Sequence, residues 1–232
     1  MLSIDVLTPA QMEAIDLRQA KQQSEWKAIP AEGKFVRLLD MELLVLPGVF
    51  PPNESTVFLA EHLHISTGSS VLDVGTGTGA LALLAARQGA ASVVAVDIAA
   101  AALRNAKRNV ERLGLGNRVD VRAGHVFSSI TKSETFDIIV ANLPGRNKAA
   151  HDDTSAAQWD TEYRAHQALF TEARIYLRPG GIIYMVQANY PDILEMIKLA
   201  ENCGYEVVII GESIPLQGDF RKYYVLALSM SD

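Results

Sequence analysis

The clearest hydrophobic pattern in the chain is an apolar run that enters a glycine-rich turn and leaves it as an apolar helix. Residues 71–74 have the character of a buried strand, residues 75–79 read Gly-Thr-Gly-Thr-Gly, and residues 80–87 are almost all helix formers. Glycines let the backbone turn sharply, and the start of a helix offers free N–H groups to a ligand. The candidate ligand-binding residues of this element are Asp73, Gly75, Thr76, Gly77, Thr78 and Gly79.

Helical and strand-like patterns alternate along the rest of the chain. Helices are expected over residues 9–23, 55–66, 99–113, 161–177 and 190–202. Apolar runs of strand length occupy residues 92–98, 117–122, 135–140, 182–188, 205–211 and 222–229, and residues 34–46 are expected to form two short strands. This alternation predicts an α/β fold with a doubly wound sheet and helices on both faces. We expect this domain over residues 53–232, preceded by an N-terminal cap of residues 1–52.

Composition and charge exclude several other classes of protein. The chain has 232 residues, 49% of them hydrophobic, and a net charge of −6, as in a globular domain with a large core. The negative balance argues against a polyanion, so we expect no nucleic-acid partner. Cys203 is the single cysteine, so an internal disulfide is excluded, and no metal site is predicted. No apolar run is long enough to span a membrane and no signal peptide is evident, so we expect a cytoplasmic protein.

Two ligand classes fit the glycine-rich turn. Gly75, Gly77 and Ala80 match the G-x-G-x-x-[GA] fingerprint of dinucleotide-binding proteins. The acid two residues ahead of the first glycine, however, repels a pyrophosphate and attracts an ammonium group. Asp97 ends the next strand and is followed by Ile98. A carboxylate at this distance from the turn accepts hydrogen bonds from the ribose hydroxyls of either ligand.

The turn resembles motif I of the class I methyltransferases, which bind S-adenosylmethionine. That motif has an acid two residues ahead of three alternating glycines, as in residues 73–79 here. S-adenosylmethionine carries an ammonium group and no phosphate, which agrees with the charge of Asp73. The resemblance implies a seven-stranded Rossmann-like sheet with a reversed last strand, and the closing pair of strand-like runs suits it. An NAD-dependent oxidoreductase is the alternative.

A segment ahead of motif I extends the resemblance. Residues 45–55 read VLPGVFPPNES and are similar to the corresponding segment of the protein-glutamine N-methyltransferases, although the arginine of their pattern is absent. In that family the segment passes over the cofactor, which implies that Phe50 and Pro51 lie near its methionine end. A proline-rich linker without ligand contact is the alternative.

The resemblance implies a further group of cofactor contacts after the strand at residues 117–122. The implied residues are Gly124, His125 and Val126. Many relatives have an acid at the position of His125, where it accepts a hydrogen bond from the adenine amino group. A neutral imidazole nitrogen or the backbone can accept the same bond. A surface histidine at a strand end is the alternative.

The end of the fourth strand of the predicted sheet carries a polar amide followed by x-Pro. Asn142, Leu143 and Pro144 resemble the [DNS]-[PI]-P-[YFW] motif of amino-methyltransferases. In that motif the amide oxygen and the next backbone carbonyl hold the N–H groups of a planar nitrogen, which is otherwise a poor nucleophile. The resemblance implies that these three residues are catalytic and that Asn142 contacts both the cofactor and the methyl acceptor. A turn residue that only closes the strand is the alternative.

The motif is incomplete, because Gly145 stands where its aromatic residue is expected. The missing aromatic normally stacks on a planar methyl acceptor, so Trp159 and Tyr163 are the candidates to replace it. Asn-Leu-Pro also occurs in the tRNA guanine-N1 methyltransferases, so the motif favours nitrogen without identifying the methyl acceptor. Residues 146–160 are polar and lack a clear period, as is typical of a lid over a binding site.

Together these segments resemble a class I S-adenosylmethionine-dependent methyltransferase, nearest to the glutamine N-methyltransferase and small-domain branch. We expect methyl transfer to a nitrogen of a small molecule or of a protein amide or amine. The N-terminal cap is shorter than the release-factor-binding domain of the glutamine family, which favours a small molecule. The alternatives are an RNA N-methyltransferase and a non-catalytic module that binds the cofactor. No oligomeric state is predicted.

Overall fold

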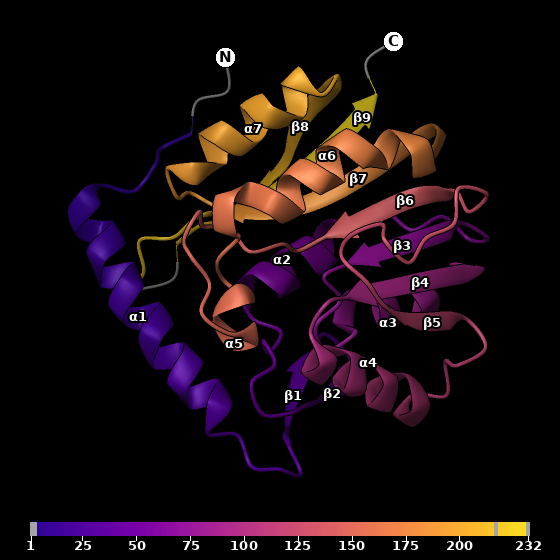
Figure 1. Ribbon diagram of the computed structural model, residues 1–232, viewed down its shortest axis with the longest axis horizontal. Coiled ribbons are helices and arrows are strands. Elements are labelled where there is room, and N and C mark those ends of the chain that lie inside the picture. Colours follow the sequence, from indigo (N-terminus) through magenta and orange to yellow (C-terminus); the bar gives the residue numbers. More distant parts are fainter. Residues whose placement is uncertain (1–3, 216–217, 231–232) are drawn as a thin grey trace.

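The protein is built around a seven-stranded sheet (Figure 1). The computed structural model describes residues 4–215 and 218–230. The strands of the sheet are β3 (Ser70–Val74), β4 (Ser92–Asp97), β5 (Val119–Ala123), β6 (Phe136–Ala141), β7 (Leu177–Ala188), β8 (Tyr205–Glu212) and β9 (Tyr223–Met230). Their order is β5-β4-β3-β6-β7-β9-β8, and β9 runs antiparallel to both of its neighbours. The predicted α/β fold, with a seven-stranded sheet and a reversed last strand, is confirmed.

Helices cover both faces of this sheet. The helices of the described chain are α1 (Pro9–Lys27), α2 (Glu54–His62), α3 (Ala80–Arg87), α4 (Ala100–Arg112), the single turn α5 (Asp153–Ala156), a 3₁₀ turn (Thr161–Tyr163), α6 (Arg164–Tyr176) and α7 (Asp192–Asn202). α2, α3 and α4 share one cluster of buried apolar side chains with one sheet face, and α6 and α7 share a second cluster with the other. Val71 faces the first cluster and its neighbour Leu72 the second, as the two-residue period of a strand requires.

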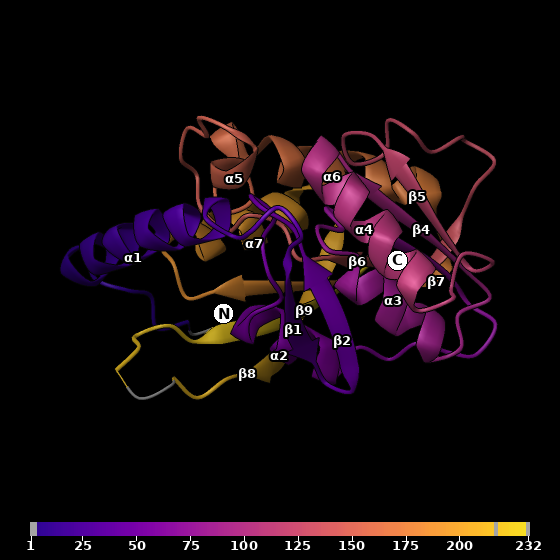
Figure 2. The ribbon, with the colours of Figure 1, turned by 90° about the horizontal axis from the view of Figure 1, so that it is seen from below.

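The carboxyl ends of the parallel strands meet at one edge of the sheet, and α1 lies beyond that edge. Figure 1 shows the arrowheads of β3 and β6 pointing toward the side on which α1 lies. Figures 1 and 2 both place α5 beside α1, and Lys27 and Asp152 form an ion pair there at 2.6 Å. Ligands of open α/β sheets bind at the carboxyl edge of the strands. The fold therefore directs the search for a site to the space bordered by α1 and α5.

A hairpin formed by β1 (Lys34–Leu38) and β2 (Met41–Val45) packs against α4. Asn109 of α4 accepts a hydrogen bond from the Leu44 N–H at 2.8 Å and donates to the carbonyls of Leu44 and Thr78 at 2.8 and 2.9 Å. Asn105, one helical turn earlier, binds the backbone of the same hairpin. Both amides are fully buried. They hold the outer edge of β2 and connect it, through Thr78, to the glycine-rich turn.

Some predicted boundaries differ from the structure. The second predicted helix ends at His62 rather than at residue 66, because Leu63 takes an extended conformation. β7 begins at Leu177 rather than at residue 182, because Leu177 already pairs with Phe136 of β6. Among the described helices none is long and apolar enough to cross a bilayer. The domain boundary at residue 52 stays a prediction.

Replacing Asn109 with alanine is expected to destabilise the fold. The change leaves the Leu44 N–H and the Thr78 carbonyl buried without their hydrogen bonds, which costs about 2–4 kcal/mol of unfolding free energy. Arg108→Ala, at an exposed position of the same helix, is the control and should change stability by about 0.5 kcal/mol or less. Urea unfolding measures both variants. Equal stabilities would show that the amide does not hold the hairpin.

Candidate functional site

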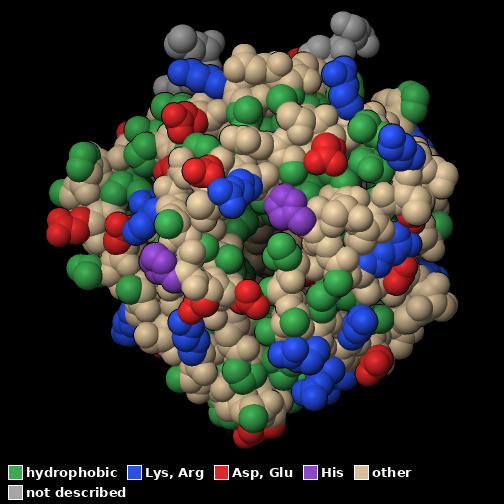
Figure 3. Space-filling view, in the orientation of Figure 1, with side chains coloured by type: hydrophobic (Ala, Val, Ile, Leu, Met, Phe, Trp, Pro, Cys, Tyr) green, Lys and Arg blue, Asp and Glu red, His purple; other side chains and the backbone are tan. Residues whose placement is uncertain are grey.

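One cavity of about 530 Å³ lies at the carboxyl edge of the sheet, within the range of small-molecule sites. Its walls come from the glycine-rich turn, the ends of β4, β6 and β7, the start of α2, and α1. Figure 3 shows an opening at the centre of the face viewed in Figure 1. The cavity is therefore connected to the surface while most of its wall is inside the protein.

The glycine-rich turn is fixed at the floor of this cavity by bonds to β4. The N–H groups of Gly75 and Thr76 both donate to the Val96 carbonyl, at 2.9 and 3.0 Å, and the Gly77 N–H donates to Oδ2 of Asp97 at 2.9 Å. Gly75 and Gly77 have φ angles of +71° and +56°, which favour glycine. A Cβ on Gly77 would meet nothing closer than 4.0 Å, so the backbone here is open to a ligand. This cradle fits the close approach of a cofactor such as S-adenosylmethionine.

Asp73 is placed differently from the expectation that it contacts the ligand directly. The side chain is buried beneath the turn and does not line the cavity. Its Oδ2 accepts hydrogen bonds from the Thr76 hydroxyl at 2.6 Å and the Ala82 N–H at 3.1 Å. Burial raises the pKa of Asp73 to about 6, although these hydrogen bonds oppose the shift. Asp73 thus orders the turn and places a titratable charge below it.

Asp97 lines the cavity at the end of β4. Its two carboxylate oxygens accept hydrogen bonds from Gly77 N and Ala99 N, each at 2.9 Å. The pKa of Asp97 lies above its usual value, because burial disfavours the charged carboxylate and the charge of Asp153 adds to this effect. Hydrogen bonds from the N–H groups of Ala99, Gly77 and Ile98 oppose the shift only in part. Each carboxylate oxygen keeps a lone pair for a ligand hydroxyl. The geometry is compatible with the ribose contact that the sequence predicts.

The remaining candidates for cofactor binding divide into two groups. Those that line the cavity are Phe50, Thr76, Thr78, Ile98, Gly124, His125 and Val126. Pro51 and Gly79 do not line it. A Cβ on Gly79 would lie 3.3 Å from Ala106, so this glycine allows α3 to pack closely on α4. Direct cofactor contact by Pro51 and Gly79 is therefore not supported by the geometry.

Asn142 ends up where the sequence predicts it, just past β6 and on the cavity wall, with Leu143 and Pro144 beside it. Its Nδ2 donates a hydrogen bond to the Thr56 hydroxyl at 3.1 Å. Thr56 is held in turn by Asn53, whose side chain caps α2. Within the described chain no group donates to Oδ1 of Asn142, so the amide presents an oxygen to the cavity.

A second amide on the wall was not predicted. Gln187 of β7 is 2% exposed, and its Nε2 lies 3.1 Å from Nε2 of His166. His166 is fully buried on α6, and its Nδ1 lies 2.7 Å from Oδ2 of Asp160. Burial raises the pKa of Asp160, but the hydrogen bonds from the His166 imidazole and from the N–H groups of Ala165 and His166 outweigh it, so the pKa lies below its usual value. These three side chains form a hydrogen-bonded chain that ends at the cavity.

The aromatic residue missing from position 145 has a structural explanation. A Cβ on Gly145 would lie 2.7 Å from Oε1 of Gln187 and 3.5 Å from the ring of Tyr190. The buried Tyr190 and the predicted Trp159 both line the cavity and supply aromatic surface to it. The interpretation of Tyr163 as an acceptor contact is corrected, because Tyr163 does not line the cavity. Its hydroxyl lies instead 2.9 and 2.8 Å from carboxylate oxygens of Asp192 and Glu195 of α7 and shares its one proton between them.

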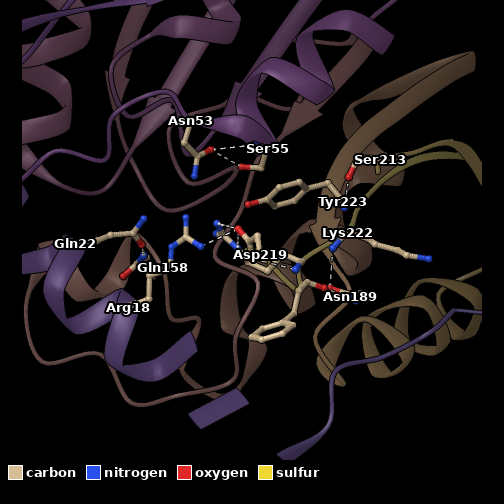
Figure 4. A network of polar contacts seen from close by, with 12 residues as sticks. Arg18, Gln22, Asn53, Ser55, Gln158, Asn189, Ser213, Asp219, Lys222 and Tyr223 are labelled. Atoms are coloured by element: carbon tan, nitrogen blue, oxygen red, sulfur yellow. Dashed lines mark hydrogen bonds and ion pairs between the residues drawn. The ribbon is translucent and has the colours of Figure 1, made fainter. Parts of the chain in front are cut away.

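β9 contributes an unsatisfied hydroxyl that sequence analysis also missed. Tyr223 is 8% exposed and lines the cavity, and its hydroxyl has no hydrogen-bond partner in the described part of the chain. Figure 4 shows its side chain extended toward Asn53 and Asp219. Asp219 binds both Arg18, at 2.8 Å, and the buried Arg221, at 2.6 Å. Tyr223 has no local motif that marks it, because antiparallel pairing with β7 brings it to the cavity.

α1 covers the cavity mouth through polar contacts. Trp159 donates from Nε1 to Gln19 at 2.9 Å, and Gln158 exchanges hydrogen bonds with Gln22 and Gln23 at 3.2 and 2.9 Å. Figure 4 shows Gln22 and Gln158 side by side. The predicted lid at residues 146–160 is thus a wall segment that is closed against α1. Chemically, the cavity combines a backbone cradle and a carboxylate at one end with side-chain amide oxygens and aromatic rings.

Comparison with known proteins agrees with this geometry. Residues 40–207 match the sequence profile described as Methyltransferase small domain. A release factor glutamine methyltransferase from Gloeobacter violaceus is 30% identical over 210 residues, covering 80% of this chain and 73% of that protein. A ribosomal protein L11 methyltransferase from an Exiguobacterium strain is 36% identical over 114 residues, but covers only 49% of this chain and 36% of that protein. The chain thus spans about a third of the length of this relative.

A solved methyltransferase structure also resembles this protein. The Thermus thermophilus 16S rRNA N2 G1207 methyltransferase, solved in complex with AdoMet and guanosine, superposes with a TM-score of 0.63 at 27% identity. The superposition covers 86% of this chain and 50% of that one. The resemblance inferred from motif I is confirmed, and the chain belongs to the Methyltransferase small domain family, within the class I methyltransferases.

Proposed function

We propose that this protein transfers a methyl group from S-adenosylmethionine to a nitrogen atom. The observation that carries the proposal is Asn142, which shares one cavity with the glycine-rich turn and Asp97. Its NH₂ group is held by Thr56, so its oxygen is free to accept an N–H from the methyl acceptor. An N–H held in this way keeps the nitrogen lone pair directed at the methyl group, and alignment of this kind contributes much of the catalysis.

The turn and Asp97 are the proposed cofactor site. Gly75 and Gly77 offer bare backbone, Asp97 offers carboxylate oxygens to the ribose, and Asp73 provides negative charge for the ammonium group from below. The further cofactor contacts that we propose are Phe50, Thr76, Thr78, Ile98, Gly124, His125 and Val126, with Asn142 near the methyl group. When bound, the cofactor supplies an electrophilic methyl group on a sulfonium sulfur, which keeps the electron pair of the broken S–C bond.

The methyl acceptor is proposed to lie between Asn142 and the aromatic wall. Asn142 and the Leu143 carbonyl hold an N–H of its nitrogen, Pro144 stiffens this segment, and Trp159 or Tyr190 stacks on its planar group. The nitrogen lone pair forms the new N–C bond, and one N–H proton then leaves to solvent at the cavity mouth. The exposed carboxylate of Asp153 lines the cavity and is available to take it.

We propose a protein amide, or a small molecule with an amide or amine, as the methyl acceptor. The glutamine and L11 methyltransferases among the relatives are named for protein substrates. The location that we propose is the cytoplasm. An RNA base is the second candidate, because relatives also include ribosomal RNA methyltransferases. The net charge of −6 argues against broad contact with a phosphate backbone.

Incubation with methyl-labelled S-adenosylmethionine and an extract of the native cell tests the proposal. Label in the protein or small-molecule fraction supports it, whereas label in RNA supports the second candidate. Binding of S-adenosylhomocysteine without any transfer would support a non-catalytic module. A thermal shift with NAD(H) and none with S-adenosylhomocysteine would instead support an oxidoreductase.

Asn142→Ala is expected to keep cofactor binding and lose turnover. Removing the oxygen leaves the acceptor nitrogen unaligned, so the transfer rate should fall about 100-fold or more. Calorimetry with S-adenosylhomocysteine should give an affinity close to that of wild type. Asn147→Ala, at an exposed position outside the cavity, is the matched control. Lost cofactor affinity with intact turnover would refute the role of Asn142.

The affinity for S-adenosylhomocysteine is expected to depend on the ionisation of Asp73. Because the pKa of Asp73 is raised to about 6, the carboxyl is largely protonated at pH 5 and ionised at pH 7. An ammonium group above the turn favours the ionised form, so affinity should rise with pH through about 6 and level off above it. Calorimetry on wild type and Asp73→Asn measures this. A variant that keeps the full rise would contradict the role of Asp73.

A further inference from the structure

A buried histidine that the proposed mechanism does not use lies behind the cavity wall, next to Gln187. His166 is fully buried, and Asp160 and Gln187 are 6% and 2% exposed. Asp160 accepts three hydrogen bonds, from the backbone N–H groups of Ala165 and His166 at 3.0 and 3.1 Å and from the imidazole at 2.7 Å. A carboxylate in that position fixes the proton of His166 on Nδ1. Nε2 faces the NH₂ group of Gln187 at 3.1 Å, so Nε2 is the acceptor of that hydrogen bond and carries no proton.

This tautomer determines which end of Gln187 faces the cavity. A lone pair on His166 Nε2 accepts a hydrogen bond and cannot donate one, so it binds the NH₂ group of Gln187, at 3.1 Å. The Gln187 oxygen is thereby turned away from the histidine and toward Gly145 on the cavity wall, where it would lie 2.7 Å from an added Cβ. No described residue donates a hydrogen bond to this oxygen. The glycine at position 145 leaves room for this oxygen, because a Cβ there would collide with it.

Gln187 therefore has the same arrangement as Asn142. In both amides the NH₂ group is committed to a protein partner, Thr56 for Asn142 and His166 for Gln187, while the oxygen is left for a ligand. Two oxygens that can only accept hydrogen bonds suit a group with two hydrogens to donate. A hydroxyl or a nitrogen that is already methylated has fewer hydrogens and leaves one oxygen unpaired, which costs free energy in a buried site.

We propose that Gln187 is a specificity-determining residue that binds the methyl acceptor, and that His166 and Asp160 are positioning residues that orient its amide. The proposal rests on the proposed methyl transfer to nitrogen. It identifies the acceptor as a primary amide or amine whose nitrogen carries two hydrogens, one bound by Asn142 and one by Gln187. One N–H proton is lost as the N–C bond forms, so the product keeps a single N–H and is methylated once.

Gln187→Met tests the contact with little change in side-chain volume. With the extract fraction that wild-type protein labels as the acceptor, kcat/KM for that fraction should fall about 10-fold or more, while the affinity for S-adenosylhomocysteine stays within about twofold. Gln167→Met, at an exposed position on α6, is the matched control and should behave as wild type. Mass spectrometry of the wild-type product should find one methyl group on the acceptor nitrogen.

A second measurement does not depend on turnover. In ¹⁵N-correlated spectra of the imidazole rings, wild-type His166 should carry its proton on Nδ1, and Gln187→Met should shift the Nε2 resonance and leave Nδ1 nearly unchanged. His166→Phe frees the Gln187 amide and should lower kcat/KM in the same direction as Gln187→Met.

The outcomes separate this inference from the proposed function. Three results would overturn the inference alone, provided that wild-type protein labels a nitrogen. They are full activity of Gln187→Met, a dimethylated product, and a proton on Nε2 of His166. Binding of S-adenosylhomocysteine without any labelling by wild-type protein would overturn the proposed function and this inference with it.

Discussion

A buried side-chain amide must satisfy both of its ends, and this constraint separates the amides that build the fold from those that face the cavity. Asn105 and Asn109 have both ends bonded to backbone, and they hold the hairpin of β1 and β2 against the sheet domain. Among the residues that the structure describes, Asn142 and Gln187 each have only the NH₂ end bonded to protein. Their oxygens are left for a ligand, and the chemistry that we propose for this cavity follows from that difference.

Much of the fold was predictable, because the central strands β3, β4 and β6 are buried on both faces and read as continuous apolar runs between helical patterns. The stretch from β3 through α3 is the clearest case, since the glycine-rich turn needs positive φ angles that few other residues adopt. Boundaries were less predictable where tertiary pairing extends an element. Leu177 looks like the end of a helix in sequence, but its pairing with Phe136 makes it the start of β7.

The site was predictable only where a local motif marks it. Asp97 and Asn142 follow directly from the ends of strands, and both line the cavity. Gln187, Tyr190 and Tyr223 lie far along the chain, within or next to ordinary apolar strands, so their presence on the cavity wall depends on the pairing of β7 with β6 and β9. For Asp73 the motif predicted a direct ligand contact, and only the packing reveals that its carboxylate lies beneath the turn.

The central claim is that a cofactor cradle and the side-chain amide oxygens of Asn142 and Gln187 face one shared cavity. A crystal structure with S-adenosylhomocysteine bound tests it most directly. The account predicts the ribose on Asp97, the amino-acid end over the glycine-rich turn, and the sulfur directed at the space between Asn142 and Gln187. A ligand whose sulfur points away from both amides, or a cradle that binds a diphosphate in place of the amino-acid end, would contradict the account.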